Sequence, residues 1–233
     1  VTRVEDLGRD LLVRFETENG TLELAGSTIV NATGTWGSPF VPHYPGIRSF
    51  AGRHVHTAEY TDATDFADQD VVVVGAGTSA IGFILELEPH ARSITWATRM
   101  LDESELNLEA AEKAVAAQDD AARAGRALPS IVSGTGVPRT RRIQAAIDRG
   151  LLEFRPMFDV IEADGVRWTE HDVFQPAQAI VWATGFRPEL RHLAPLKLRE
   201  KEGGVTVASH HSERDPRVFF AGYGPAASTI GAN

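Results

Sequence analysis

The sequence predicts an α/β fold with a parallel sheet, and three observations predict it. Four consecutive valines, Val71–Val74, form a run typical of a strand buried on both faces. Gly75 and Gly77 follow that run at once. An apolar series at helical spacing, Ala80 to Leu87, comes next. We therefore expect a strand, a tight turn and a helix over residues 70–87.

The glycine spacing in this stretch, GxGxxA, is that of a dinucleotide-binding turn. Gly75 permits a sharp turn, Gly77 lets the backbone approach a pyrophosphate, and Ala80 lets helix and strand pack closely. The unpaired amides at the helix start, around Thr78 and Ser79, would hold the phosphates. The structural alternative is a glycine turn that binds nothing. The context on both sides favours a Rossmann-like domain that binds a dinucleotide.

Composition bounds the possible functions. The chain has 233 residues, of which 42% are hydrophobic and 24% charged, as is ordinary for a globular protein. The net charge of −9 argues against nucleic acid and against an anionic membrane as partners. The absence of cysteine removes disulfides and thiolate catalysis, and the histidines show no metal-ligand spacing. With no membrane span or signal peptide recognisable, a cytoplasmic enzyme is the default expectation.

The first residues predict a small β-meander. Leu11–Phe15 is a strand, Glu18–Thr21 a hairpin turn and Thr21–Leu24 the return strand. A third strand is expected over Ser27–Ala32, running into Thr33 and Gly34. Such a piece is too small to bury a core alone, so it must dock on another part of the protein.

Residues 37–69 are expected to form an extended connector. This segment carries Pro39, Pro42 and Pro45 and shows neither the helical nor the strand period. Its second half has Phe50, Gly52, His56 and Tyr60 at regular spacing. In the structural alternative, Gly52 ends a turn while His56 and Tyr60 are surface residues.

The end of the strand that follows the glycine-turn helix indicates whether NAD or NADP is bound. It is expected over Arg92–Thr98 and is followed by Arg99, with no acidic residue until Asp102. A carboxylate at this place would bind the ribose hydroxyls of NAD, whereas an arginine suits the 2′-phosphate of NADP. The alternative is a surface arginine whose stem packs on the sheet.

Two further helices are expected before the chain returns to strands. Residues 103–124 are rich in alanine with interspersed charges, which predicts an intrinsically stable helix. A break rich in glycine, serine and proline follows over 129–138, and helical period resumes over Arg139–Ile147. The arginines there could meet phosphates, but a solvated basic helix face is the favoured interpretation.

The second half repeats an earlier pattern. Gly165–Trp168 parallels Val13–Phe15, and Ile180–Gly185 parallels Ile29–Gly34, so that two meanders each end in Ala-Thr-Gly. Two related dinucleotide-binding units follow from this repeat, yet only one GxGxxA is present. We expect a fragment whose first unit has its glycine turn before Val1, with a further buried strand over Arg217–Gly224 and a helix beginning at Ser228.

With these residues in hand, the chain resembles the flavin-containing monooxygenases, in particular the small bacterial ones, over almost its whole length. Phe50, Gly52, His56 and Tyr60 match the family fingerprint FxGxxxHxxx(F/Y/W), and residues 75–80 match the GxGxSA of the NADPH domain. The resemblance implies four segments: 1–36 as part of an FAD-binding domain, 37–69 as the connector, 70–183 as the NADPH-binding domain and 184–233 as an incomplete return into the FAD-binding domain. It also implies that both Ala-Thr-Gly segments are hinges between domains.

The resemblance implies cofactors and residue roles. NADPH would reduce FAD, and reduced flavin would take up dioxygen as a C4a-hydroperoxide that oxygenates an amine, a sulfide or a ketone. Cofactor contacts are implied for residues of the glycine turn, the strand end and the hinges (Gly75, Gly77, Thr78, Ser79, Ala80, Arg99, Thr33, Gly34, Thr184, Gly185 and Gly222). His56 and Tyr60 are the candidate catalytic residues, and for His56 we expect positioning rather than proton transfer. Tyr60 instead of Trp resembles the branch that oxygenates heteroatoms.

Two alternatives stay open. One is a pyridine-nucleotide-dependent flavoprotein reductase acting on disulfides or electron carriers, against which the Phe50–Tyr60 fingerprint argues. The other is an NADPH-binding module without enzymatic activity. The partners expected are a small-molecule substrate and dioxygen, with a homodimer left open as the assembly. The isolated chain is expected to bind NADPH but to hold FAD poorly.

Overall fold

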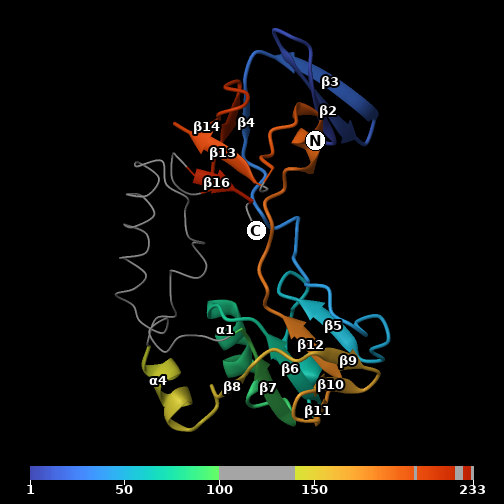
Figure 1. Cartoon of the computed structure of the whole chain (residues 1–233), viewed down its shortest axis with the longest axis vertical. Helices are drawn as coiled ribbons and strands as arrows, with labels where there is room; N and C mark the ends of the chain where they lie inside the picture. The colour runs from blue at the N-terminus through green and yellow to red at the C-terminus, as the bar shows by residue number, and fades with distance from the viewer. Residues whose placement is uncertain (100–139, 202–203, 224–227, 232–233) are drawn as a thin grey trace. The chain divides into compact units, whose positions relative to one another are not determined.

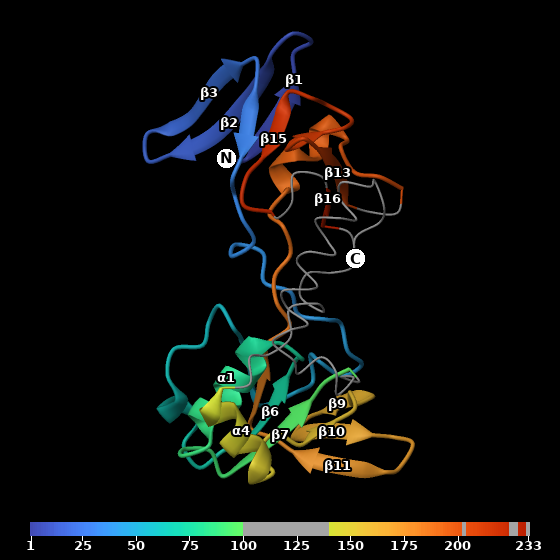
Figure 2. The ribbon, with the colours of Figure 1, turned by 90° about the vertical axis from the view of Figure 1, so that its left-hand side faces the viewer.

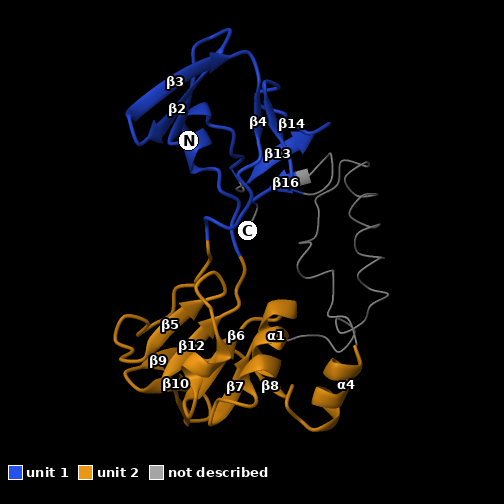
Figure 3. Ribbon diagram, turned by 180° about the vertical axis from the view of Figure 1, so that it is seen from behind, with its two compact units in different colours: residues 1–38, 115–129, 186–233 blue, residues 39–114, 130–185 orange. Residues whose placement is uncertain are grey.

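The computed structural model describes residues 1–99, 140–201, 204–223 and 228–231, which fall into two compact units (Figure 3). The first unit contains the described residues of Val1–Ser38 and Phe186–Asn233, and the second those of Pro39–Ala114 and Ser130–Gly185. The helix expected over 103–124 and the break over 129–138 lie outside the described residues.

The second unit is built on a parallel sheet of five strands, in agreement with the predicted fold class (Figure 1). In spatial order these are β5 (Arg53–His56), β12 (Ala179–Trp182), β6 (Asp70–Val74), β7 (Ser93–Ala97) and β8 (Phe154–Arg155). The valine strand β6 is central and buried throughout. The predicted strand before Arg99 is also confirmed, as β7.

Both faces of this sheet are covered, which explains why its central strand is apolar without alternation. Val71 and Val73 face a core shared with α1 (Thr78–Leu87), the 3-10 helix η1 (Ala63–Phe66) and α4 (Arg141–Asp148). Val72 and Val74 face a second core with the meander of β9 (Val160–Glu162), β10 (Gly165–Trp168) and β11 (Val173–Pro176), seen on the opposite side in Figure 2. The helices predicted after the glycine turn and over Arg139–Ile147 are confirmed as α1 and α4. None of the described helices is long and apolar enough to cross a membrane.

The first unit combines a mostly antiparallel sheet with a separate meander. The sheet order is β16 (Ser228–Ile230), β13 (Val205–Ala208), β14 (His211–Ser212), β15 (Val218–Phe220) and β4 (Ile29–Asn31). The meander contains β1 (Arg3–Asp6), β2 (Leu11–Thr17) and β3 (Gly20–Gly26). Val4 and Leu11 join the core of this unit beside the 3-10 helix η3 (Arg191–Leu196), so the meander does dock as expected.

The third strand of the first meander was predicted wrongly. Residues 27–32 contain β4, which leaves the meander and pairs in parallel with β15, while β1 supplies the third meander strand. The physical reason is burial, because β3 is exposed along almost its whole length and a strand beside it would cover nothing. Beside β15, by contrast, β4 lies against the core that contains Val218 and Phe220. The second meander is followed by the same arrangement, because β12 does not pair with β9–β11 but lies between β5 and β6 in the parallel sheet.

Two other expectations need correction. The segment 37–69 is more than a connector, because β5 and η1 within it belong to the sheet and core of the second unit. The chain from Ser228 forms the strand β16 and not the start of a helix. Its β-branched residues suit a strand, and Ile230 pairs with Val205 and is buried in the core.

Candidate functional site

The turn after β6 can be made only with glycine at position 75. Gly75 has a φ of +140°, and a Cβ there would lie 2.2 Å from the carbonyl oxygen of Ala183. The indole of Trp96 donates to the Gly75 carbonyl at 2.6 Å, and the Gly75 amide donates to Ala97 at 3.1 Å. The turn is therefore held between β7 and the end of β12, as the sharp-turn role of Gly75 requires.

Gly77 is different, because nothing in the described structure requires a glycine there. It is the N-cap of α1 with a φ of −89°, and no atom lies within 4 Å of an added Cβ. Thr78 and Ser79 are exposed in the first helical turn, whereas Ala80 is fully buried against the sheet. No side chain caps this helix. The first-turn amides thus have no side-chain cap and can receive an anion.

Arg99 lies at the same edge of the sheet as this turn. It follows β7, which is the parallel neighbour of β6, and its side chain is exposed. Burial raises the pKa of Tyr44, and the nearby positive charge of Arg99 opposes that rise. Ligands of parallel sheets bind beyond the carboxyl ends of the strands, where Arg99 and Gly77 both lie.

His56 is not a surface residue. It is the last residue of β5, and only 3% of its surface is exposed. Its Nδ1 accepts a hydrogen bond from the Ala58 amide at 3.1 Å. The Nε2 therefore carries the proton and donates to the Gly185 carbonyl at 2.9 Å. Thr184 donates its hydroxyl to the Phe40 carbonyl. The second Ala-Thr-Gly segment is thus tied to the fingerprint histidine within one unit.

The other fingerprint residues act through packing. Gly52 lets β5 approach β12, because a Cβ there would lie 2.5 Å from the Gln178 carbonyl oxygen. Tyr60 stacks on Phe66 of η1 at a centroid distance of 5.6 Å and makes a tilted ring contact with Phe83 of α1 at 4.3 Å. Burial, reinforced by the charge of Glu86, raises the pKa of Tyr60 to about 12. Its buried hydroxyl nevertheless forms no hydrogen bond of ordinary geometry with the described residues.

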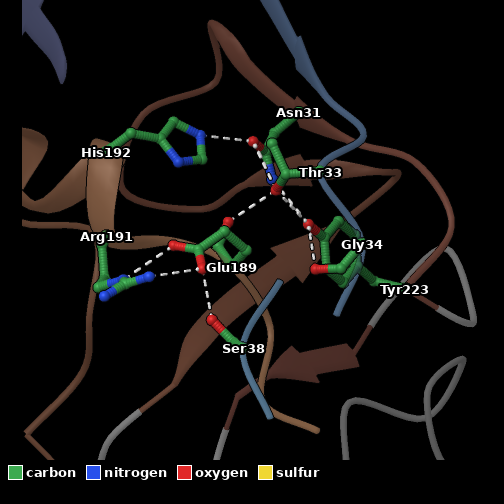
Figure 4. Close-up of polar contacts among 8 residues, drawn as sticks. All are labelled: Asn31, Thr33, Gly34, Ser38, Glu189, Arg191, His192 and Tyr223. Carbon is green, nitrogen blue, oxygen red and sulfur yellow. Dashed lines mark hydrogen bonds and ion pairs between the residues drawn. The ribbon is translucent and has the colours of Figure 1, made fainter. Parts of the chain in front are cut away.

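The first unit has a comparable edge, where the parallel strands β4 and β15 end together. Gly34 follows β4 with a φ of +64°, and Gly222 follows β15 with a φ of +82°. No described atom lies within 4 Å of a Cβ added at either glycine, and the same holds for Gly185, with a φ of +75°, in the second unit. Thr33 differs, because its hydroxyl donates to the Glu189 carbonyl at 2.6 Å, so this side chain is engaged by protein groups (Figure 4).

A carboxylate, Glu189, orders the polar groups around that edge. Arg191 donates two hydrogen bonds of 3.0 Å to it, and the Ser38 hydroxyl donates a third (Figure 4). These bonds lower the pKa of Glu189 to about 2. The carboxylate thus stays ionised and holds residues 38 and 189, far apart in sequence, together.

Sequence reasoning missed Trp96 and Ala183 at the glycine turn and Glu189 in the first unit. It also missed three residues joined by hydrogen bonds beside Thr33, namely Asn31, His192 and Tyr223 (Figure 4). Tyr223 could have been found, because it directly follows Gly222 at the end of a predicted strand. The others act on partners remote in the chain, for which no local pattern exists.

The fold and these edges define an α/β protein of the Rossmann-like type. A family model described as "Pyridine nucleotide-disulphide oxidoreductase" matches residues 1–118, and the chain belongs to this family. The solved flavin-containing monooxygenase from Stenotrophomonas maltophilia superimposes over 100% of the chain with a TM-score of 0.77 and 28% identity. The predicted resemblance to flavin-containing monooxygenases is thereby confirmed.

Two curated relatives are also monooxygenases. The trimethylamine monooxygenase of Pelagibacter ubique is 37% identical over 68 residues, which is 29% of this chain. The Baeyer-Villiger monooxygenase of Streptomyces coelicolor is 34% identical over 83 residues, which is 36% of this chain. The matched parts cover 15% and 16% of these relatives, and the chain spans 66% of the solved enzyme.

Proposed function

We propose that this chain carries the nucleotide-binding parts of a monooxygenase that uses NADPH, FAD and dioxygen to oxygenate a small substrate. The observation that carries the proposal is the bond from His56 to Gly185. It ties the histidine of the monooxygenase fingerprint to the Ala-Thr-Gly segment beside the glycine turn. The flavoprotein reductases and the NADPH-binding modules considered as alternatives give no reason for this fingerprint.

Each edge has a role in this proposal. The open amides after Gly77 hold the pyrophosphate of NADPH, with Thr78 and Ser79 at its rim, and Arg99 pairs with the 2′-phosphate. The edge with Gly34 and Gly222 takes FAD. When bound, NADPH supplies hydride and FAD activates dioxygen. This chain binds and orients both, and residues 1–36 and 184–233 serve FAD while 70–183 serve NADPH.

His56 acts in this proposal as a positioning residue. Both ring nitrogens are occupied by backbone groups, because Nδ1 accepts from the Ala58 amide and the proton on Nε2 is donated to the Gly185 carbonyl. It orients Gly185, at the carboxyl edge of the NADPH-binding sheet. Tyr60 anchors the same segment on α1 through Phe83.

The substrate class proposed is a small nucleophile with nitrogen or sulfur, or a carbonyl compound. The relatives include a trimethylamine monooxygenase and a Baeyer-Villiger monooxygenase, which span these chemistries. Tyr60 in the last fingerprint position favours the nitrogen and sulfur substrates.

The test is a set of turnover assays on the protein as it is naturally produced, with NADPH and isotopically labelled dioxygen. A tertiary amine, a thioether and a cyclic ketone serve as probes. We expect NADPH oxidation with labelled oxygen in the product of at least one probe. NADPH oxidation that instead reduces a disulfide or an electron carrier would favour the reductase, and NADPH binding without oxidation would favour the binding module.

A further inference from the structure

A directed series of hydrogen bonds lies at the carboxyl edge of β4 and β15, outside the roles given above (Figure 4). Asn31 is the last residue of β4 and is buried. His192 comes from η3 and is also buried. Tyr223 follows β15, and Thr33 belongs to the first Ala-Thr-Gly segment. Three parts of the chain, around residues 31–33, 192 and 223, thus meet in one polar cluster.

The donors and acceptors of the series follow from the shortest contacts. His192 Nε2 donates to Asn31 Oδ1 at 2.7 Å, and burial lowers the pKa of His192, which keeps the imidazole neutral. Asn31 Nδ2 donates to the Tyr223 hydroxyl at 3.0 Å. Thr33 gives its own proton to the Glu189 carbonyl, so the Tyr223 proton points to Thr33 Oγ1 at 2.8 Å. The orientation of each group in the series is thus set by the hydrogen bond from the group before it.

The series leaves two backbone donors unused. Within the described part of the chain, neither the Gly34 amide nor the Gly222 amide donates a hydrogen bond. Both amides belong to glycines at which no described atom lies within 4 Å of an added Cβ. The Tyr223 hydroxyl also lies 3.3 Å from the Gly34 carbonyl, so the group that organises the series touches both glycine segments.

We propose that Tyr223 and Asn31 are positioning residues that hold the Ala-Thr-Gly segment so that the amides of Gly34 and Gly222 face a flavin nucleotide. The inference rests on the proposed function, in which this unit takes FAD. Asn31 and His192 align the Tyr223 hydroxyl, which in turn fixes Thr33 and Gly34. None of the four side chains needs to touch the nucleotide.

The test uses Tyr223→Phe in the protein as it is naturally produced, with Tyr44→Phe in the second unit as the matched control. FAD and NADPH dissociation constants are measured by titration, and amide hydrogen exchange is followed over residues 31–38. We expect the FAD dissociation constant to rise about tenfold, because loss of the hydroxyl leaves the side-chain amide of buried Asn31 without its acceptor and Thr33 without its donor. Amide exchange at residues 33–35 of Tyr223→Phe should accelerate, while its affinity for NADPH should equal that of the wild type. Tyr44→Phe should equal the wild type in all three measurements.

Thr33 provides a second, independent pair of variants. Thr33→Val should weaken FAD as Tyr223→Phe does, and Thr33→Ser, which keeps the hydroxyl, should restore it. The double variant Tyr223→Phe/Thr33→Val should lose no more than either single variant, because both break one series.

Unchanged FAD affinity in Tyr223→Phe and Thr33→Val would overturn the inference, even if both variants lost stability. That result would leave the proposed function intact, because the wild type would still bind FAD. A wild type that binds NADPH but not FAD would overturn both, so the two failures are distinguishable.

Discussion

The imidazole of His56 donates a hydrogen bond of 2.9 Å to the carbonyl of Gly185, a residue 129 positions further along the chain. This bond joins the end of the edge strand β5 to the segment that follows the neighbouring strand β12. The Gly185 carbonyl also accepts from the Phe40 amide at 3.0 Å, so loss of the imidazole would remove one of its two hydrogen bonds and would also remove the acceptor of the Ala58 amide. The two ring nitrogens are both committed to the backbone, which makes the histidine a fixed support.

Replacing His56 should separate binding from turnover. His56→Ala should lower the yield of oxygenated product per NADPH oxidised much more than it lowers NADPH affinity, and should cost about 1–3 kcal/mol of stability. Titration and product analysis measure the two effects, with the exposed His43→Ala as control. If His56→Ala kept both the wild-type product yield and the wild-type NADPH affinity, the fingerprint histidine would have no positioning role.

The two glycines of the turn should respond differently to substitution. Gly77→Val should keep the fold, because its φ and its surroundings admit a side chain, but should weaken NADPH by more than about tenfold, or 1.4 kcal/mol. Gly75→Ala should destabilise the protein by at least about 1–3 kcal/mol through its positive φ and its clash with Ala183.

Thermal unfolding and NADPH titration distinguish the two glycine variants. Gly82→Ala, inside α1 with open space around it, is the control and should stabilise the helix by about 0.5–1 kcal/mol. Unchanged NADPH affinity in Gly77→Val would mean that no phosphate approaches that glycine.

Arg99 should decide between the two nicotinamide nucleotides. One charge-assisted hydrogen bond contributes about 1.5–3 kcal/mol, or roughly tenfold to somewhat over a hundredfold in affinity, and exposure of Arg99 favours the low end. Arg99→Ala should therefore weaken NADPH and leave NADH nearly unchanged, whereas the exposed Arg48→Ala should affect neither. Equal losses for NADPH and NADH would show that Arg99 is only a surface residue.

Tyr60→Phe should leave stability unchanged or raise it by up to about 1 kcal/mol, because the buried hydroxyl forms no hydrogen bond of ordinary geometry with the described residues. The ring contacts with Phe66 and Phe83 remain. Chemical denaturation measures the effect, with Tyr44→Phe as the comparison. A loss above about 1 kcal/mol would reveal a partner for the hydroxyl.

Glu189 should make the first unit sensitive to acid. Its folded-state pKa is lowered from 4.5 to about 2, so its contribution is complete above pH 4.5 and is lost as the pH falls toward 2. The contribution is about 1–2 kcal/mol, less than the full shift implies, because the Arg191 side chain is 80% exposed. Glu189→Gln should flatten the stability profile in that window.

Unfolding measured from neutral to acid pH tests this expectation, with Glu18→Gln at the exposed tip of the β2–β3 hairpin as control. Identical profiles for Glu189→Gln and the wild type would show that the ion pair contributes nothing to stability.

The sequence by itself determined the parallel sheet, the glycine turn and the helix after it. These features are local, because a buried valine run, a glycine at positive φ and an apolar helical period each show in a few adjacent residues. The spacing of residues 50–60 also identified His56 and Tyr60 as part of the monooxygenase fingerprint.

Only the tertiary structure decided which strands lie together. Ile29–Asn31 and Ala179–Trp182 both follow a meander, yet each leaves it for a parallel neighbour where its apolar side chains find a core. The connector supplied the edge strand β5 for the same reason. The Ser38–Glu189, Asn31–His192 and His56–Gly185 contacts join residues more than 120 positions apart. Hydrogen bonds of this kind depend on where folding brings the groups, and no periodicity along the chain encodes them.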